Sequence, residues 1–249
     1  MPDHSALLVE VEAMCREAGE IALRCRESLQ TELKPDGSIV TNADREVEEF
    51  LRREIGRAMP GAAIWGEEMG YEAPNEKGLW VIDPVDGTSN FTYGQPLWGT
   101  TVGYFLDGAL QLGCINCPEL GWSLAGARGG GATMNGKAMT PIRPGKIEKF
   151  DLVGYGSVRM AVERQYPGKV RHVGAFVVEA GMFVTGGLRA LLTNGVRLYD
   201  AAAGIVIARE LGAEIREMDG SEWDETEWTG EKRCRTFGFF PPGSGWEFD

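Results

Sequence analysis

The sequence Trp80-Val-Ile-Asp-Pro-Val-Asp-Gly-Thr-Ser-Asn-Phe91 decides how the fold of this chain is interpreted. Its apolar start predicts a buried strand. Pro84 has no N–H with which to continue a hydrogen-bond ladder, so we expect the strand to end at Ile82. Asp83 and Asp86 follow, three residues apart. Two neighbouring carboxylates repel each other, which favours a cation between them.

Two small residues directly after these acids add a second signal. Gly87 and Thr88 place backbone N–H groups there, in a pattern typical of a helix start or an anion nest. Carboxylate oxygens are ligands of hard divalent cations, and bare amides bind anions. The stretch therefore predicts a divalent metal such as Mg²⁺ with a phosphate resting against it.

The composition limits the possible partners. The chain has 249 residues, enough for one large domain or two small lobes, and its net charge of −12 argues against binding to nucleic acid or to an anionic membrane surface. Its five cysteines do not resemble a secreted disulfide framework, and its first residues lack the basic and apolar regions of a signal peptide. We therefore expect a cytoplasmic protein with no nucleic-acid and no membrane partner.

Apolar periodicity and turn residues divide the first part of the chain into elements. Helical spacing predicts helices over residues 5–25 and 42–59. A short strand over residues 62–65 then runs into Gly66-Glu-Glu68. These elements precede the stretch Trp80–Phe91 in the sequence.

The second part of the chain predicts two kinds of structure. Residues 99–138 alternate β-rich stretches with turns, which predicts an antiparallel sheet. Strands and helical patterns alternate after the polar, proline-bearing segment 141–149. We expect a boundary in that segment, with an N-terminal α+β lobe over residues 1–145 that carries most metal ligands and a C-terminal α/β lobe over residues 146–249.

Four more acids stand at predicted element ends, where ligands are usually presented. Glu67 and Glu68 follow the short strand, Asp44 lies in the first turn of a helix, and Asp200 opens another helix. Taken singly, Asp44 and Asp200 are ordinary first-turn acids favoured by the helix dipole, and Gly-Glu-Glu is a solvated turn. Beside the Asp-x-x-Asp-Gly-Thr core they instead predict a group of metal-binding carboxylates.

These motifs resemble the inositol monophosphatase family, the Mg²⁺-dependent, lithium-sensitive phosphatases. The matching motifs agree with the family in order and spacing over residues 34–213. They are Val40-Thr-Asn-Ala-Asp44, Gly66-Glu-Glu68, Asp83-Pro-Val-Asp-Gly-Thr-Ser-Asn-Phe91 and Tyr199-Asp-Ala-Ala-Ala-Gly204. The resemblance implies an α/β (α+β) fold of two lobes in a layered αβαβα sandwich, with the site between the lobes. It also implies a homodimer.

Carried over residue by residue, the resemblance implies a site for two or three Mg²⁺ ions. Glu67, Asp83 and the Val85 carbonyl would hold the first ion. Asp83, Asp86 and Asp200 would hold the second, so that Asp83 bridges the two. Glu67 would also touch a third, weaker ion.

The resemblance also implies how phosphate is bound, with its oxygens held by the amides of Gly87 and Thr88. The nucleophile should be water that displaces the alcohol directly, because two divalent cations can stabilise both the attacking and the leaving oxygen. We expect Thr88 and Asp44 to orient and deprotonate that water, with assistance from Glu67. Lys34 is interpreted as a solvated loop residue, with a counter-charge for phosphate as the alternative.

The substrate side differs from the inositol-specific members of the family. Those members carry an acid seven positions before the helix-opening aspartate, where this chain has Thr193, a weaker acceptor. Arg197 is interpreted either as a contact for a second anionic group or as a surface arginine. Gly174 and Ala175 match a stretch that lines the substrate hydroxyl pocket, and Ser157 matches a nearby polar position, although small residues also permit close packing.

The predicted activity is a Mg²⁺-dependent phosphomonoesterase that acts on a small phosphorylated metabolite, an alcohol or sugar similar to inositol 1-phosphate. Histidinol phosphate and fructose 1,6-bisphosphate stay open as substrates, and Pro96-Leu-Trp-Gly-Thr100 looks similar to members that act on histidinol phosphate. A regulatory binding protein that retains the fold is the alternative from another class. Every ligand position is filled, which favours catalysis.

Overall fold

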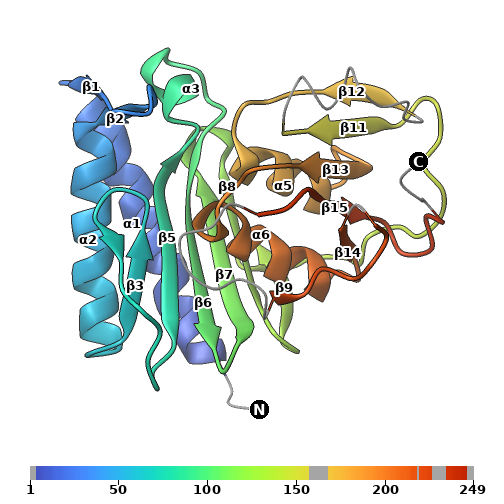
Figure 1. Cartoon of the computed structure of the whole chain (residues 1–249), viewed down its shortest axis with the longest axis horizontal. Coiled ribbons are helices and arrows are strands. Elements are labelled where there is room, and N and C mark those ends of the chain that lie inside the picture. The colour runs from blue at the N-terminus through green and yellow to red at the C-terminus, as the bar shows by residue number, and fades with distance from the viewer. Residues whose placement is uncertain (1–3, 157–167, 218, 226–233, 246–249) are drawn as a thin grey trace.

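The computed structural model describes residues 4–156, 168–217, 219–225 and 234–245. In these residues a pair of helices, an eight-stranded sheet, a second pair of helices and a five-stranded sheet follow one another as layers (Figure 1). This layered mixture of helices and sheets confirms the predicted fold class. The described residues supply the first four of the five layers that the resemblance implies.

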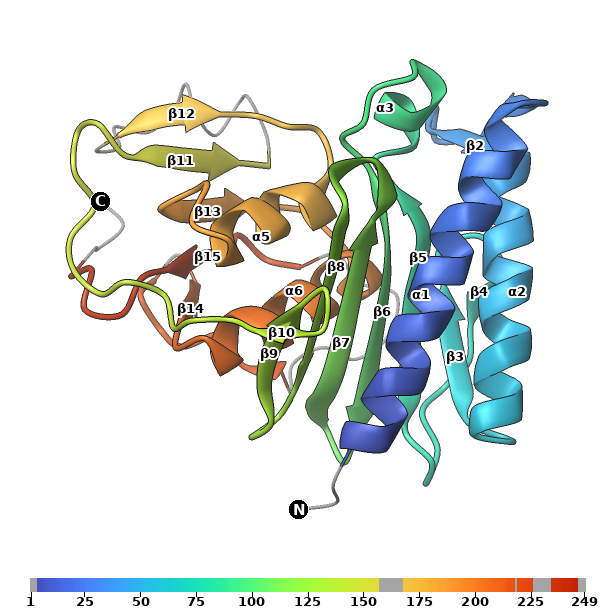
Figure 2. The same ribbon diagram turned by 180° about the vertical axis from the view of Figure 1, so that it is seen from behind.

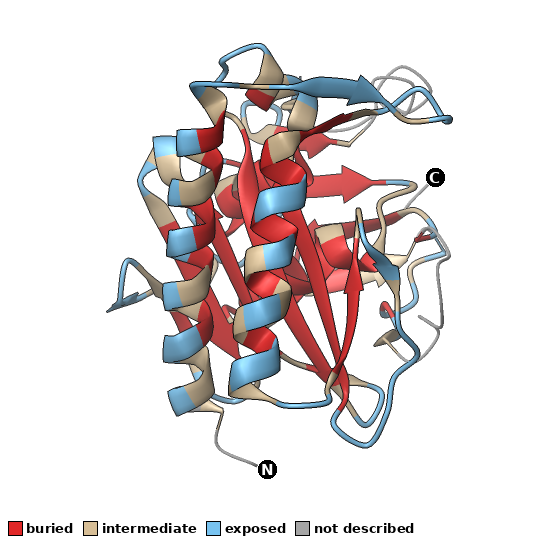
Figure 3. Cartoon of the chain, turned by 90° about the vertical axis from the view of Figure 1, so that its left-hand side faces the viewer, coloured by how far each residue is buried: buried red, intermediate tan, exposed pale blue. Residues whose placement is uncertain are grey.

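The first layer consists of α1 (Ser5–Arg26) and α2 (Asn42–Ala58), which lie side by side against one face of the large sheet (Figures 1 and 2). Their inward residues are buried and their outward residues are exposed, as Figure 3 shows. On α2 the buried apolar residues Val47, Leu51 and Ile55 recur at helical spacing. Both helices match the ranges predicted from periodicity to within one residue at each end.

The eight-stranded sheet has the order β10-β9-β8-β7-β6-β5-β3-β4. Its strands are β3 (Ala63–Gly66), β4 (Gly70–Tyr71), β5 (Leu79–Asp86), β6 (Gly99–Leu106), β7 (Ala109–Cys117), β8 (Trp122–Ala127), β9 (Gly131–Met134) and β10 (Lys137–Ala138). Neighbouring strands are antiparallel except β3 and β5, which run parallel. The antiparallel sheet predicted for residues 99–138 is therefore confirmed.

Strand β5 continues past the residue at which the sequence predicts its end. It reaches Asp86, and its register against β6 shifts between Asp83 and Asp86. Pro84 lies in this irregularity, so its missing N–H interrupts no regular ladder, and its carbonyl accepts a hydrogen bond from Thr100 Oγ1 at 2.8 Å. The expectation that the strand ends at Ile82 is wrong, because the shifted register accommodates the proline.

The inner helical layer consists of α5 (Phe176–Val184) and α6 (Leu198–Glu210), which lie between the two sheets (Figures 1 and 2). Helix α6 is buried along nearly its whole length, which its apolar composition permits. Small residues allow a close approach to the large sheet, because a Cβ on Gly113 of β7 would lie 2.4 Å from the Cα of Ala203. No helix in the described part of the chain is long and apolar enough to cross a membrane.

The five-stranded sheet has the order β12-β11-β13-β15-β14. Its strands are β11 (Leu152–Tyr155), β12 (Lys169–Arg171), β13 (Ala190–Thr193), β14 (Glu214–Glu217) and β15 (Phe237–Phe240). β11 is parallel to both β12 and β13, whereas β15 is antiparallel to β13 and β14. The chain passes from the first sheet to the second between residues 138 and 152, and the predicted division into lobes at residue 145 stays a prediction.

The remaining described elements are short and lie at the edges of the layers. They are β1 (Thr31–Leu33), β2 (Ile39–Thr41), α3 (Thr88–Thr92) and the 3₁₀ helix η1 (Pro118–Leu120). The two large apolar clusters of the core lie on opposite faces of the eight-stranded sheet, one under α1 and α2 and the other around α5 and α6. The ends of β3 and β5 are thus held from both sides.

Candidate active site

One pocket collects most of the residues that the sequence singled out. It has a volume of about 400 Å³ and lies where the ends of β3 and β5 meet the first turns of α5 and α6. Of the predicted site residues, all except Asp44 line it, namely Glu67, Asp83, Val85, Asp86, Gly87, Thr88, Gly174, Ala175, Thr193, Arg197 and Asp200. Ser157 lies outside the described residues.

The two aspartates of the β5 motif are held by backbone amides. Asp83 Oδ1 accepts a hydrogen bond from the N–H of Val85 at 3.0 Å. Asp86 Oδ2 accepts one from the N–H of Val177 at 2.5 Å. Since Val177 belongs to the first turn of α5, the second bond fixes the end of β5 against the inner helical layer.

Helix α2 presents Asp44 to the motif from the other side of the sheet. The side chain closes a capping box, in which Asp44 Oδ2 accepts hydrogen bonds from the N–H of Thr41 at 2.7 Å and from its hydroxyl at 2.6 Å. The hydroxyl of Thr88 lies 3.3 Å from Asp44 Oδ1 and 2.9 Å from the carbonyl oxygen of Val85. Asp44 therefore reaches the pocket through Thr88. Burial raises the pKa of Asp44 to about 6.

Helix α6 presents Asp200 in the same way. Asp200 Oδ2 accepts a hydrogen bond from the N–H of Arg197 at 2.6 Å, which places the carboxylate at the pocket. Burial raises the pKa of Asp200 to about 7, and the negative charge of Glu67 adds to the effect. The first-turn aspartates of α2 and α6 are thus both capping residues, of which Asp200 also lines the pocket and Asp44 reaches it through Thr88.

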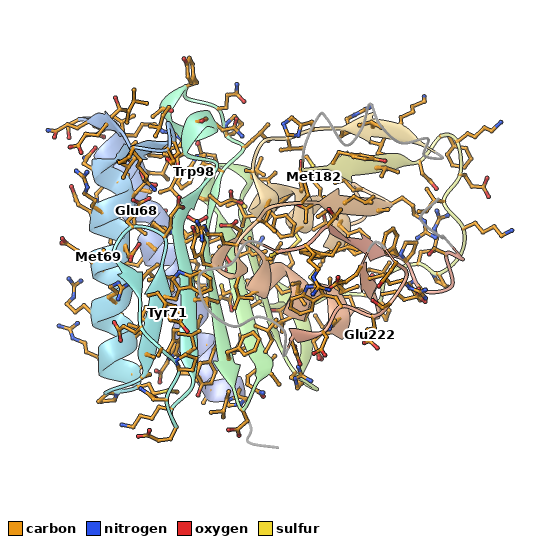
Figure 4. All side chains as sticks on the ribbon, in the orientation of Figure 1. Glu68, Met69, Tyr71, Trp98, Met182 and Glu222 are labelled. Carbon is orange, nitrogen blue, oxygen red and sulfur yellow. The ribbon has the colours of Figure 1, made fainter. Side chains whose placement is uncertain are left out.

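Glu67 and Glu68 follow β3 and meet a lysine. Lys34 Nζ lies 3.1 Å from Glu67 Oε1 and 2.5 Å from Glu68 Oε1, and only 21% of the Lys34 side chain is exposed. The interpretation of Lys34 as a solvated loop residue is therefore wrong, because the hairpin of β1 and β2 folds it onto the two acids. Figure 4 shows Glu68 beside α2, at the edge of the large sheet.

A buried acid that the sequence did not single out shapes this turn. Glu48 of α2 is fully buried and accepts hydrogen bonds from the N–H groups of Glu68 at 2.8 Å and Met69 at 2.9 Å. Arg52 Nε donates to the same carboxylate at 3.0 Å. Glu48 therefore holds the turn that presents Glu67, without lining the pocket itself.

Glycine is required where β5 turns into α3. Gly87 has φ of +89°, and a Cβ there would lie 2.8 Å from the Cβ of Ala175 and 3.0 Å from the carbonyl oxygen of Leu97. Asn90 of α3 donates hydrogen bonds to the carbonyl of Leu97 at 2.7 Å and to the carbonyl of Val173 at 3.0 Å. These contacts bring the α3 turn and the segment before α5 together in one wall of the pocket.

The C-terminal half of the chain adds lining residues that the sequence analysis missed. His172 and Glu179 both line the pocket, and Glu179 is only 1% exposed. Burial raises the pKa of Glu179 to about 7. One signal could have identified this acid, because it is the sole charged residue of the apolar α5. Thr193 is buried, and its hydroxyl has no hydrogen-bond partner among the described residues.

The charges of the pocket favour a divalent cation. Burial raises the pKa of Asp83 well above its usual value, and the charges of Glu67, Asp86 and Asp200 raise it further. Burial and the charge of Asp200 likewise raise the pKa of Asp86 well above its usual value. Oxygen ligands of this kind suit Mg²⁺ or Ca²⁺. No three His, Cys, Asp or Glu side chains of the described residues form a closed metal-binding group, so the fit rests on the shared pocket and on this repulsion.

Comparison with known proteins agrees with this geometry. The inositol monophosphatase family matches residues 3–233. The inositol-1-monophosphatase of Mesorhizobium japonicum is 29% identical over 225 residues, which cover 84% of this chain and 82% of the relative. The histidinol-phosphatase of Chlorobaculum parvum is 32% identical over 216 residues, which cover 80% of this chain and 81% of the relative.

A solved structure leads to the same conclusion. The IMPase of Thermotoga maritima superposes with a TM-score of 0.81 at 25% sequence identity, and the match covers 94% of this chain and 91% of that chain. The family match includes every acid of the pocket and all strands of both sheets except β15. This chain belongs to the inositol monophosphatase family.

Proposed function

We propose that the chain is a Mg²⁺-dependent phosphomonoesterase that hydrolyses a small phosphorylated alcohol or sugar. One observation carries the proposal. Acids from the end of β3, the end of β5 and the start of α6 line a single pocket beside the backbone amides of Gly87 and Thr88. Carboxylates that bind cations, next to amides that bind an anion, are what a phosphate ester and its metal ions require.

The acids divide into two ligand sets that share Asp83. Glu67, Asp83 and the Val85 carbonyl would hold the first cation, and Asp83, Asp86 and Asp200 would hold the second. Glu67 would also hold a third, weaker cation. When bound, the cations polarise the phosphate ester and lower the pKa of a water molecule beside it. Lys34 is a further positive group at this edge of the site, because it is ion-paired with Glu67.

The chain's own residues position the phosphate and the nucleophile. The amides of Gly87 and Thr88 bind phosphate oxygens, and the positive φ of Gly87 directs the turn toward them. The hydroxyl of Thr88 orients the attacking water. It accepts a proton from this water and donates its own hydroxyl proton to Asp44 Oδ1, which lies 3.3 Å away. A raised pKa of about 6 makes Asp44 a stronger base than an ordinary aspartate while it is still ionised at neutral pH.

Several substrates suit a pocket of about 400 Å³. Inositol 1-phosphate is the reference substrate, and histidinol phosphate and fructose 1,6-bisphosphate are the alternatives. Gly174, Ala175, Thr193 and Arg197 contact the alcohol part of the substrate. By family resemblance we also propose inhibition by Li⁺ and a homodimer in solution.

Phosphate release from these three esters tests the proposal. With Mg²⁺ present we expect release from at least one ester, loss of release when the metal is chelated, and inhibition when Li⁺ is added. The Asp83→Asn variant should be inactive, since it removes the ligand shared by both cations. Absence of release from every ester with Mg²⁺ would instead favour a regulatory binding protein that retains the fold.

A further inference from the structure

Two residues of α2, Glu48 and Arg52, hold the turn that follows Glu67. The side chain of Glu48 is fully buried, and its Oε2 accepts the N–H of Glu68 at 2.8 Å. Its Oε1 accepts the N–H of Met69 at 2.9 Å and Nε of Arg52 at 3.0 Å. Both oxygens of this carboxylate thus have donors, and the guanidinium supplies the opposite charge that a buried acid requires.

Arg52 extends this support to the strand after the turn. Its Nη2 donates to the carbonyl oxygen of Gly70 at 2.9 Å, and its Nη1 lies 3.1 Å from Oε1 of Glu72. Gly70 begins β4, which pairs with β3 across the turn. The backbone after Glu67 is therefore fixed to α2 at three successive residues, Glu68–Gly70.

The glycine of Gly66-Glu-Glu68 has its reason in the same carboxylate. The φ of Gly66 lies outside the left-handed region, so the backbone alone does not require glycine there. A Cβ on Gly66 would, however, clash with both carboxylate oxygens of Glu48. The backbone on both sides of Glu67 is thus in close contact with Glu48.

The carboxylate of Glu67 has little support of its own. Among the described residues it bonds only to Lys34, at 3.1 Å, whereas the carboxylates of Asp83 and Asp86 each accept a backbone N–H. The side chain of Glu67 is also 25% exposed. Its direction toward the pocket therefore depends on the turn. Removing a group that orients a metal ligand typically weakens metal binding by about 10–100-fold.

We propose that Glu48 is a positioning residue that sets the affinity of the pocket for divalent cations by fixing the turn of Glu67. This inference rests on the proposed function, because it takes Glu67 as a cation ligand. Glu48 does not line the pocket, so it contacts neither the cations nor the phosphate. Its removal should weaken cation binding and leave the amides of Gly87 and Thr88 in place.

Binding of Mn²⁺ without substrate tests the inference, since carboxylates also bind this cation. Free Mn²⁺ is measured by electron paramagnetic resonance during titration of the folded chain. Glu48→Gln keeps the volume of the side chain but replaces one oxygen with an NH₂ group, which cannot accept an N–H. We expect at least one Mn²⁺ ion to bind about tenfold or more weakly than in the parent chain. Equal affinity in the folded variant would overturn the inference.

Glu72→Gln is the matched control. Glu72 also bonds Arg52, but its side chain is 54% exposed and its carboxylate accepts no N–H of the turn 67–69. This variant should bind Mn²⁺ as tightly as the parent chain. An equal loss in Glu72→Gln would overturn the inference, because it would trace the effect to the pairing of Arg52 and not to the turn.

Glu48→Asp carries the test if Glu48→Gln does not fold. Aspartate keeps the charge that pairs with Arg52, but it is shorter by one CH₂ group and cannot reach both N–H groups. Mn²⁺ should bind several-fold more weakly, and unchanged affinity would overturn the inference.

The Mg²⁺ dependence of turnover separates positioning from a merely structural role. In the Glu48 variants the Mg²⁺ concentration for half-maximal turnover should rise about tenfold, and turnover at saturating Mg²⁺ should return to within a few-fold of the parent value. A lower unfolding temperature with an unchanged Mg²⁺ requirement would instead show that Glu48 only stabilises the fold. If the parent chain hydrolyses no ester but its Mn²⁺ affinity depends on Glu48, the proposed function fails and this inference stands.

Discussion

The helices α2 and α6 begin in the same way but present their aspartates differently. Each has an aspartate in its first turn whose Oδ2 accepts the N–H of the residue three positions earlier. In α2, Asp44 Oδ2 also accepts from the hydroxyl of Thr41, and its Oδ1 faces the hydroxyl of Thr88. In α6, the carboxylate of Asp200 lies on the pocket itself.

This difference separates the roles of the two residues. Hydroxyl groups surround Asp44, so its oxygens are suited to accept a proton from a neighbour. Asp200 has a backbone amide on one oxygen, and burial and the charge of Glu67 raise its pKa, which suits a cation. A helix cap is therefore no argument against function, because a carboxylate has two oxygens and the cap occupies only one of them.

Of these two aspartates, Asp200 is expected to give the larger effect when it is neutralised. Asparagine can still accept from the N–H of Arg197, so the helix start is kept, but one cation ligand is lost. We expect turnover to fall about a thousandfold or more, since several kcal/mol of charge stabilisation depend on the cations. With the metal chelated, the same variant should unfold at a higher temperature than the parent chain, because one repelling charge is gone.

Steady-state kinetics and thermal unfolding check both halves of this prediction. Asp219→Asn is the matched control, since Asp219 accepts a backbone N–H from Ser221 at 2.9 Å on the exposed surface. It should change neither quantity by much. Turnover within a few-fold of the parent chain in Asp200→Asn would show that α6 contributes a cap and nothing else.

A smaller loss is expected from Asp44→Asn. The amide cannot accept the proton, so turnover should fall about a hundredfold, within the range of general base catalysis, with little change in KM. In the parent chain Asp44 must be ionised to act, and its pKa is about 6. Turnover should therefore decline as the pH falls through about 6, and the variant should lack this decline.

The pH profile of turnover is the decisive measurement for α2. Thr41→Val serves as a control for the cap, because it removes the hydroxyl that bonds Asp44 and should cost about 1 kcal/mol of unfolding free energy. Its turnover should stay well above that of Asp44→Asn. Identical pH profiles in the parent chain and Asp44→Asn would assign the base to another residue.

The sequence predicts those parts of the structure that depend on near neighbours. The start of α2 follows from Val40-Thr-Asn-Ala-Asp44, because the capping box closes over three residues. The convergence of Asp44, Asp83 and Asp200 in space does not follow from their spacing, and it was inferred from the family resemblance. The pocket agrees with that inference for the acids that line it.

Features that depend on distant partners could not be predicted. The passage of β5 through Pro84 requires Thr100, and the burial of Lys34 requires acids more than thirty residues away. No local pattern encodes either contact. Glu179 is different, since a lone acid in an apolar helix is visible in the sequence and predicts a buried carboxylate.

A moderate effect is expected at Gly87, where β5 turns into α3 beside the pocket. Gly87→Ala forces φ of +89° on alanine and brings its Cβ to 2.8 Å from that of Ala175. We expect a loss of about 1–3 kcal/mol of unfolding free energy and about tenfold lower turnover, because the amides that face the phosphate shift. Gly94→Ala has φ of +70° but no atom within 4 Å of the new Cβ, so it should cost less. Denaturant unfolding measures both, and equal losses would exclude the contact with Ala175.

The smallest expected effect concerns Thr193, seven residues before Asp200. Valine has nearly the same shape and lacks the buried hydroxyl, which has no partner in the described part of the chain. The unfolding free energy should therefore stay the same or rise by at most about 1 kcal/mol, since no hydrogen bond to a described residue is lost. If the hydroxyl contacts the substrate as proposed, KM should rise several-fold for esters with a hydroxyl near the phosphate, with kcat nearly unchanged. An unaltered KM together with higher stability would make Thr193 a packing residue and leave recognition on the α6 side to Arg197.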